Sequence, residues 1–266
     1  MTDPPTGGAQ PSRYPGDPDN PGAAFQARGA KVVVRRALRR SRELIGDDPV
    51  FLPIVLRLTP LGTSRRITDR TEIVIEGFPR SGNTFATFAL HEAEGREVDV
   101  SSHVHVPAQV KVAVKMGKPT LVVVRDPMGT LTSLLTAAPH VRFDAAIREY
   151  IHHHRELVPF RDGFVVGTFE KTTTDFSAVI DAVNQRFGTT FSTFTQTPET
   201  VDRVFDRIDA HHRRTYGDQA SERVVPRPSR ARHAEKVWLA DQLQSRRYAG
   251  LMADARDIYD ELADGA

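Results

Sequence analysis

The chain has 266 residues, which suits one sizeable α/β domain, and its 36 basic and 34 acidic side chains leave a formal net charge of only +2. A charge so close to zero gives no reason to expect a nucleic-acid partner. The sequence contains no cysteine, which excludes disulfides, thiolate metal sites and cysteine nucleophiles and suits the reducing cytoplasm, where we expect the protein.

Two segments are predicted ahead of the domain. Residues 1–30 are rich in proline and glycine and cannot bury enough apolar surface to fold, so we predict a disordered tail. Residues 31–70 form a predicted basic helical extension, in which residues 31–45 carry a narrow apolar stripe among arginines. This helix either lies on the anionic inner face of a membrane or packs its valines on the domain. No apolar run in the chain is long enough to cross a bilayer.

The remaining residues, 71–266, are predicted to form the domain itself. A β-branched run from Ile73 predicts a strand, and a glycine-bounded turn joins it to a helix over residues 83–92 that ends at Gly95. Residues 97–100 alternate like a short strand. A helix then starts at Pro107, a residue typical of the first helical turn.

A second strand–helix pair follows in the middle of the chain. Residues 120–124 are continuously apolar, which is typical of a strand buried on both faces of a parallel sheet. Asp126 and Pro127 then predict a helix start, as N-cap and first helical residue, with the helix running to about Ala137. The later predicted elements are a strand at 164–168 and helices at 143–158, 175–188, 199–213, 233–242 and 246–262.

Strands that alternate with helices predict a three-layer α/β/α fold, with a central parallel sheet of about four to five strands and a P-loop-like nucleotide-binding topology. Ligands of such sheets bind beyond the carboxyl ends of the strands. The turn between Gly77 and Gly82 would lie there, and its backbone N–H groups and those at the next helix N-terminus suit an anion.

The turn differs from the triphosphate-binding loop G-x-x-x-x-G-K-[ST] at one decisive position. Asn83 stands where the lysine that reaches the β- and γ-phosphates belongs, and Arg80 is the only cation in the loop. This argues against an ordinary ATPase or kinase. An atypical nucleotide-dependent phosphotransferase remains an alternative.

Two motifs, in order, carry a resemblance to a known family. The loop at residues 78–85 resembles the 5′-phosphosulfate loop of sulfotransferases that use 3′-phosphoadenosine 5′-phosphosulfate, and residues 121–127 with Ser133 resemble their 3′-phosphate motif. The similar region spans roughly residues 73–191. The resemblance implies that this nucleotide is the co-substrate, that no metal is needed, and that the nucleotide is bound by Arg80, Ser81, Gly82, Asn83, Thr84, Phe85, Arg125 and Ser133.

A third segment concerns the chemistry itself. His105 precedes Val106 and Pro107 in a string similar to the family's His-x-Pro segment, whose histidine is the catalytic base in many members. His103 is the alternative base, and a glutamate at position 92 or 97 is a further option. Arg80 would stabilise charge on the leaving phosphate. The implied reaction is in-line sulfuryl transfer to a hydroxyl or amine of a small-molecule, carbohydrate or lipid acceptor; a non-catalytic domain that binds nucleotide or a partner remains another interpretation.

Two further features of the sequence are weaker signals. The basic loop at 221–232 occupies the position where cytosolic members of the family carry an Arg-Lys-Gly segment over the nucleotide, and although that string is missing here, Arg227 and Ser229 are our candidates for the same role. The run of His152, His153 and His154 suggests a metal site at first sight. Consecutive helical residues point in different directions, so we predict no metal site there.

Overall fold

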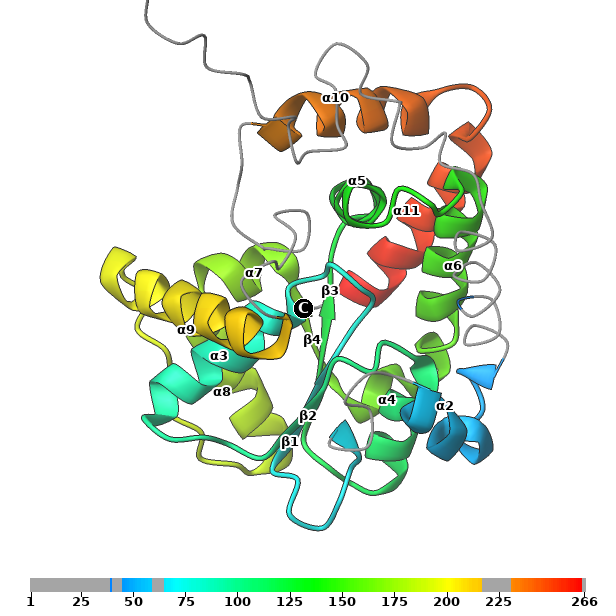
Figure 1. Ribbon diagram of the computed structural model, residues 1–266. Helices are drawn as coiled ribbons and strands as arrows, with labels where there is room; N and C mark the ends of the chain where they lie inside the picture. Colours follow the sequence, from blue (N-terminus) through cyan, green and yellow to red (C-terminus); the bar gives the residue numbers. More distant parts are fainter. Residues whose placement is uncertain (1–38, 40–44, 59–64, 217–230, 265–266) are drawn as a thin grey trace, which may run out of the picture.

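The computed structural model describes residues 39, 45–58, 65–216 and 231–264. Its centre is a parallel sheet in the order β2-β1-β3-β4. The strands are β1 (Ile73–Glu76), β2 (Val100–Ser102), β3 (Thr120–Val124) and β4 (Val165–Thr168). With helices on both faces (Figure 1), the molecule has the predicted three-layer α/β/α fold and a sheet of four described strands. The P-loop-like character of its topology stays a prediction.

The two central strands explain why the sequence favours this sheet. Every residue of β1 and of β3 is buried, and most are β-branched, which suits strands covered on both faces. Val74 pairs with Thr120, and Ile75 with Leu121. This register brings the carboxyl ends of β1 and β3 side by side, so whatever follows each strand meets at one edge of the sheet.

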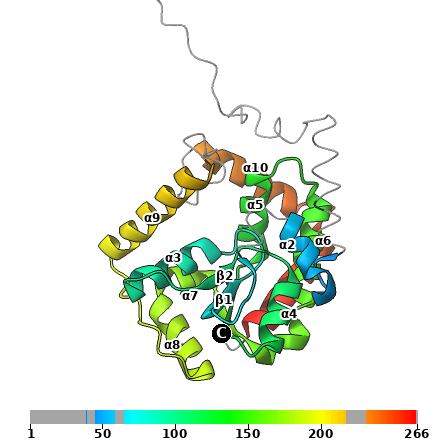
Figure 2. The same cartoon turned by 60° about the horizontal axis from the view of Figure 1, so that its bottom comes forward.

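One face of the sheet is covered by α3 (Asn83–Glu94) and α8 (Phe176–Phe187), with α9 (Pro198–Tyr216) packed against α3 (Figure 2). Ile73, Ile75 and Val123 point into this layer, in one apolar cluster with residues of the three helices. Gly95 and Gly188 end α3 and α8 in the left-handed conformation, as the sequence predicts for Gly95.

The opposite face is covered by α4 (Pro107–Lys115) and α11 (Ala249–Ala263), which contact β3 from this side. Val122 and Val124 alternate with the residues of the other face and pack here against Val110 and Leu262. Pro107 is at the first helical position of α4, as predicted. The period-2 alternation of β3 therefore builds two apolar layers from one strand.

Beyond the end of β3, α5 (Pro127–Ala137), α6 (Phe143–Arg155), α10 (Ala231–Gln244) and α11 enclose a second apolar core. Asp126 caps α5 by accepting a hydrogen bond from the Gly129 amide at 2.8 Å, so the predicted N-cap is confirmed. Leu239 and Leu243 are fully buried in this core.

Before the sheet, η2 (Pro49–Phe51) and α2 (Leu52–Leu58) pack on α4, where Val55 meets the buried side chains of Val104 and Val106. The predicted tail at 1–30 lies outside the described residues, as does most of the predicted helix at 31–45. Of that helix, Ile45 packs against the apolar cluster that contains Val55, and Arg39 forms an ion pair with Glu149 of α6.

Two predictions of secondary structure were wrong in detail. The strand predicted at 97–100 begins only at Val100, because the preceding backbone bonds elsewhere: the Val98 amide donates to His91 Nδ1 at 2.9 Å. The predicted helix at 143–158 ends at Arg155 and gives way to the 3-10 helix η4 (Val158–Gly163). A short helix, α7 (Phe169–Thr174), follows β4 where none was predicted. In the described part of the chain, no helix is long and apolar enough to cross a bilayer.

Candidate functional site

The predicted site residues gather where β1 and β3 end. The turn after β1 passes so close to β3 that a Cβ on Gly77 would lie 2.2 Å from the carbonyl oxygen of Val123. Only glycine fits there. Gly82, at the start of α3, has a φ of 107°, a conformation that side chains other than glycine rarely adopt. The two glycines thus shape the loop, as the sequence predicts for a cradle built from backbone N–H groups.

The loop itself is anchored by an aromatic residue and turns sharply after it. Phe78 is buried in the helical core, edge-on to Tyr150 with ring centroids 5.4 Å apart. Arg80 has a positive φ of 75°, an uncommon conformation that tends to mark functional loops. The hydroxyl of Ser81 is buried and has no hydrogen-bond partner among the described residues. A buried orphan hydroxyl beside an arginine suits a bound anionic oxygen.

Three candidates at the start of α3 use their side chains inside the protein. The Asn83 amide donates to the carbonyl oxygen of Gly77 at 3.2 Å, and Thr84 Oγ1 lies 2.9 Å from His103 Nε2. Phe85 is buried, beside Phe194. Because the first amides of a helix lack intrahelical partners, it is the backbone N–H groups of these residues that remain suited to an anion. The side chains of Asn83 and Phe85 hold the loop and the core.

Arg125 extends from the end of β3 toward the loop. Its Nη1 donates to the carbonyl oxygen of Arg80 at 3.3 Å, and its guanidinium carbon lies 3.8 Å from the ring centroid of Phe169. Among the residues that the structure describes, the buried Nε has no hydrogen-bond partner and Arg125 forms no ion pair. Burial lowers the pKa of this arginine, with partial compensation from Asp126 and Glu170. A desolvated cation with an unused donor is a strong anion receptor.

The backbone of Arg125 is held as firmly as its side chain. Tyr150, buried in α6, donates its hydroxyl to the Arg125 carbonyl oxygen at 2.7 Å. Burial raises the pKa of this tyrosine, so it stays a neutral donor. Tyr150 and Phe169 are therefore part of the site, although neither was among the predicted site residues.

Ser133 joins the two halves of the site. It is two turns into α5, and its Oγ accepts a hydrogen bond from Arg80 Nε at 3.0 Å. Arg80 thus contacts Ser133 through its side chain and Arg125 through its carbonyl oxygen. The predicted 5′ loop and the predicted 3′ motif are in direct contact.

Both candidate bases are in the left-handed conformation, His103 with φ 63° and His105 with φ 56°. His105 Nδ1 lies 2.8 Å from the Gly77 carbonyl oxygen, which can only accept a hydrogen bond. In the neutral ring this shorter contact favours the proton on Nδ1 and the basic lone pair on Nε2, although the Asn83 amide nitrogen also lies 3.3 Å from Nδ1. His105 is in this way oriented by the loop that it faces, and its side chain is 23% exposed.

His103 has a different environment. It is half-buried, and its two ring nitrogens lie 2.9 Å from Thr84 Oγ1 and 2.6 Å from Ser102 Oγ. Burial, reinforced by nearby His105 and Arg65, lowers the pKa of His103 well below its usual range. A ring with both nitrogens engaged and little basicity suits a positioning role better than that of a base.

Glu76, the last residue of β1, is a site residue that the sequence analysis missed. Its carboxylate is 1% exposed and accepts hydrogen bonds from the backbone amides of Val104 at 2.7 Å and His105 at 3.1 Å. Burial raises its pKa to about 7, although these hydrogen bonds favour the charged form. The signal was present, because an acidic residue closing a run of β-branched residues is unusual in a strand buried on both faces.

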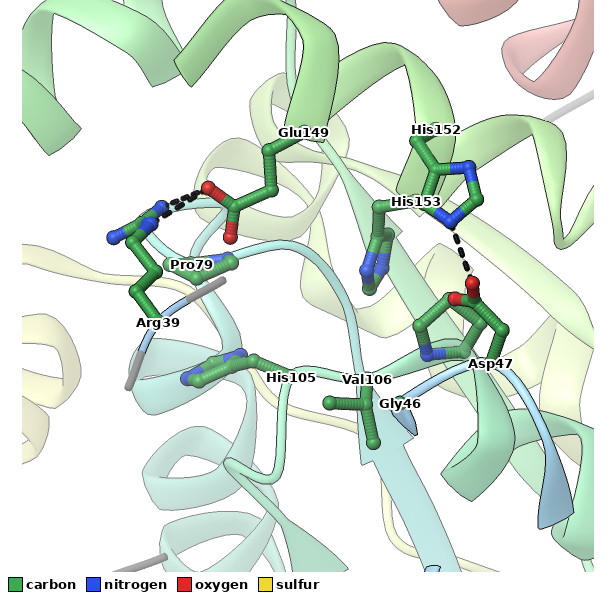
Figure 3. A pocket seen from close by; sticks show the side chains of 10 residues that line it. Arg39, Gly46, Asp47, Pro79, His105, Val106, Glu149, His152 and His153 are labelled. Carbon is green, nitrogen blue, oxygen red and sulfur yellow. Dashed lines mark hydrogen bonds and ion pairs between the residues drawn. The ribbon is translucent and has the colours of Figure 1, made fainter. Parts of the chain in front are cut away.

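A small cavity of about 100 Å³ opens beside His105, and Figure 3 shows its lining. Pro79 and Val106 lie on either side of the histidine, and His153 closes the far end. The ion pair of Arg39 with Glu149 borders it, as does the hydrogen-bonded pair of His152 and Asp47 at 2.6 Å. The cavity has room for one small chemical group next to the ring, such as the hydroxyl-bearing carbon of a larger molecule.

The remaining candidates lie away from this centre or outside the described residues. Glu92 and Glu97, the alternative bases, form ion pairs with Arg203 and Arg207 of α9. Arg227 and Ser229 lie outside the described residues. His153 and His154 are buried against Phe78, and within the described ranges no group of three or more metal-ligating side chains converges.

No protein-family model matches this chain, and no curated protein matches it significantly. The function is therefore argued from the site alone.

Proposed function

We propose that this protein is a sulfotransferase that moves a sulfuryl group from 3′-phosphoadenosine 5′-phosphosulfate to an acceptor hydroxyl or amine. One observation carries the proposal: two anion receptors, the loop around Arg80 and the pair Arg125 and Ser133, adjoin at the ends of neighbouring parallel strands. A nucleotide with phosphate at both its 5′ and 3′ positions fits two such receptors better than a triphosphate does.

The two receptors differ in the charge that they suit. The 3′-phosphate is a dianion, and Arg125, whose buried Nε has no partner among the described residues, would offer it charge and hydrogen-bond donors together with the Ser133 hydroxyl. The 5′-phosphosulfate suits the amides at the start of α3, the buried Ser81 hydroxyl and Arg80. Asn83 in place of a lysine leaves no second cation for a γ-phosphate in the loop.

In the proposed reaction the acceptor oxygen attacks the sulfur in line with the bond from sulfur to the bridging phosphate oxygen. The new bond from acceptor oxygen to sulfur forms as the old bond breaks, and the acceptor proton passes to His105 Nε2. The leaving phosphate takes the electron pair, and Arg80 with the loop amides stabilises its charge. Arginine keeps its proton, so the leaving group is stabilised by charge and hydrogen bonding alone.

The proposal is tested by the nucleotide that the protein binds. Adenosine 3′,5′-bisphosphate at about 100 times its Kd adds about 2.7 kcal/mol to the free energy of unfolding, and we expect the Tm to rise by roughly 5 to 10 °C. The double variant Arg125→Ala, Ser133→Ala should lose this rise. Arg186→Ala, on the exposed surface of α8, is the matched control and should keep it.

Two ligands complete the test. Adenosine 5′-phosphosulfate, which lacks the 3′-phosphate, should bind to the wild type at least tenfold more weakly than adenosine 3′,5′-bisphosphate does. A Tm that rises with ATP but not with adenosine 3′,5′-bisphosphate would replace the proposal with a phosphotransferase. Binding of the bisphosphate without transfer of labelled sulfate to any acceptor would leave a non-catalytic nucleotide-binding domain.

A further inference from the structure

A second, larger cavity lies on the other side of the histidine pair. It has a volume of about 880 Å³ and runs between α3 and α9, which pack along one another in both ribbon views. Ser102 and His103 form the end of the cavity nearest the candidate site. We call this cavity the α3–α9 groove.

The α3–α9 groove is strongly basic. Four arginines line it, against a single carboxylate, that of Glu97. Glu97 is already paired with Arg207 at 2.7 Å. Arg213 and Arg214 are exposed and form no ion pair within the described part of the chain. The groove therefore carries an excess of positive charge that this part of the protein does not neutralise.

Besides the small side chains of Thr87, Ser102 and Ala210, the other lining residues carry aromatic or imidazole rings. Phe88 lies 5.4 Å from the His211 ring and 6.0 Å from the His91 ring, measured between centroids. Burial lowers the pKa of both histidines, and Arg214 and Arg65 lower that of His211 further. Near neutral pH these histidines are uncharged hydrogen-bonding groups. Flat rings, neutral donors and acceptors, and arginines together suit a polar ring compound that bears negative charge.

The groove is also connected with the candidate site. The His103 ring is 5.7 Å from the His105 ring, centroid to centroid, and His103 contacts Thr84 of the predicted nucleotide loop. From the side of α9, Arg80 is close enough to lower the pKa of His212. A molecule in the groove would therefore have one end beside the histidine pair and the other beside Arg213 and Arg214.

We propose that the α3–α9 groove binds the acidic part of the acceptor, so that the natural acceptor carries a carboxylate, sulfate or phosphate besides the group that is sulfated. Identifying the ligand of the groove as the acceptor rests on the proposed function, but the preference of the groove for anions does not. The acceptor would be held by charge at the arginine end and would present its hydroxyl at the histidine end. The volume suits a compound of two or three sugar-sized rings.

Binding of two compact anionic probes tests the proposal by calorimetry on the full chain. Trigalacturonate supplies carboxylates, and sucrose octasulfate supplies sulfates; the trimethyl ester of the first and plain sucrose are their neutral counterparts. We expect at least one anionic probe to bind tenfold or more tightly than its counterpart, and to bind more weakly as salt is raised. The double variant Arg213→Gln, Arg214→Gln should weaken that binding about tenfold.

The controls separate the groove from the nucleotide site. Arg186→Gln with Arg256→Gln removes two exposed arginines elsewhere and should leave probe binding unchanged. The groove variant should bind adenosine 3′,5′-bisphosphate as the wild type does. Equal binding of charged and neutral probes, or equal probe binding by the groove variant and the wild type, would overturn the inference. If the wild type did not bind adenosine 3′,5′-bisphosphate, the proposed function would be wrong, whereas the result with the anionic probes would still hold.

Discussion

At the scale of single residues, the two histidines of the site suit separate roles, although they lie only two positions apart in the sequence. Both were candidates for the base because residues two apart on an extended chain face the same side. The structure shows neither histidine in an extended conformation, since both have positive φ. His105 is oriented through Nδ1 by the Gly77 carbonyl oxygen, whereas His103 has both nitrogens against hydroxyls.

This difference gives a prediction for activity. His105→Ala should lower sulfuryl transfer by about 10² to 10⁴-fold, the usual contribution of a positioned base. Binding of adenosine 3′,5′-bisphosphate should change less than about twofold. The assay is transfer of ³⁵S label from the nucleotide to an extract of carbohydrates and lipids, with the Tm of each variant recorded to show that it is folded.

His103→Gln is the matched comparison. A glutamine can still hydrogen-bond to one of the two hydroxyls, so transfer should fall by less than about tenfold. If His103→Gln abolished transfer and His105→Ala did not, the roles that we assign to the two residues would be reversed.

Individual residues also show what the sequence could and could not predict. Arg80, Arg125 and Ser133 were predicted because two segments of the sequence resemble nucleotide-binding motifs of a known family, and the structure brings these three residues together. Glu76 and Tyr150 were missed because they bind backbone groups of distant residues, at separations of 28 and 25 along the chain. A hydrogen bond to a distant backbone leaves no periodic pattern in the sequence.

At the scale of elements, the helix ends that carry a capping residue were the most predictable features. Asp126 and Pro127 start α5, and Gly95 ends α3, because capping depends on one or two local residues. The start of β2 was less predictable. Its position is set by pairing with β1, where Ile73 meets Val100, so the local alternation of residues 97–100 was overruled by a tertiary contact.

The junction of β1 with its loop gives a prediction about stability. Gly77→Ala places a Cβ 2.2 Å from the backbone oxygen of Val123, and a backbone atom cannot move away cheaply. We expect the free energy of unfolding to fall by at least about 2 kcal/mol. Gly250→Ala in α11 is the control, because its Cβ would meet nothing within 4 Å and alanine favours helices. Urea unfolding should show that variant to be unchanged or up to about 1 kcal/mol more stable.

The hydrogen bonds that Glu76, at the end of β1, accepts from the amides of Val104 and His105 should make stability depend on pH. Glu76 has a folded-state pKa of about 7, raised by burial from its ordinary value of 4.5. Between these values the folded state holds a proton that the unfolded state has released, so the free energy of unfolding falls as pH rises. Its favourable contribution is complete below about pH 4.5 and is lost as pH rises through about 7.

Glu76→Gln isolates this effect because glutamine does not titrate. The difference in unfolding free energy, wild type minus Glu76→Gln, should decrease by about 2 to 3 kcal/mol between pH 5 and pH 8, measured by urea unfolding. Contributions from histidines distant from Glu76 are common to both proteins and cancel in the difference, whereas that of His105, whose Nδ1 lies 3.9 Å from the Glu76 carboxylate, is part of the measured effect. A difference that stays constant with pH would show that the carboxylate is ionised throughout the range.

At the scale of the whole molecule, the site lies where two apolar cores meet. The loop after β1 continues into α3, which packs in one core with α8 and α9, while α5 packs in the other core with α6 and α10. In the site these two parts are linked by the hydrogen bonds of Arg80 to Ser133 and of Arg125 to the Arg80 carbonyl oxygen. A nucleotide bound to both receptors would add contacts across the same boundary.

Hydrogen–deuterium exchange can distinguish such a bridging ligand from one held by a single receptor. Adenosine 3′,5′-bisphosphate should slow amide exchange in two separate stretches, residues 78–86 and residues 125–134, because each contributes to one phosphate site. The helix α8 contributes no residue to the site and should exchange as before. Protection limited to residues 78–86 would mean that only one anion is bound, and the pairing of Arg125 with a 3′-phosphate would then be wrong. Arg125→Ala provides the internal comparison: with enough bisphosphate to saturate it, protection should persist in the loop and weaken at the start of α5.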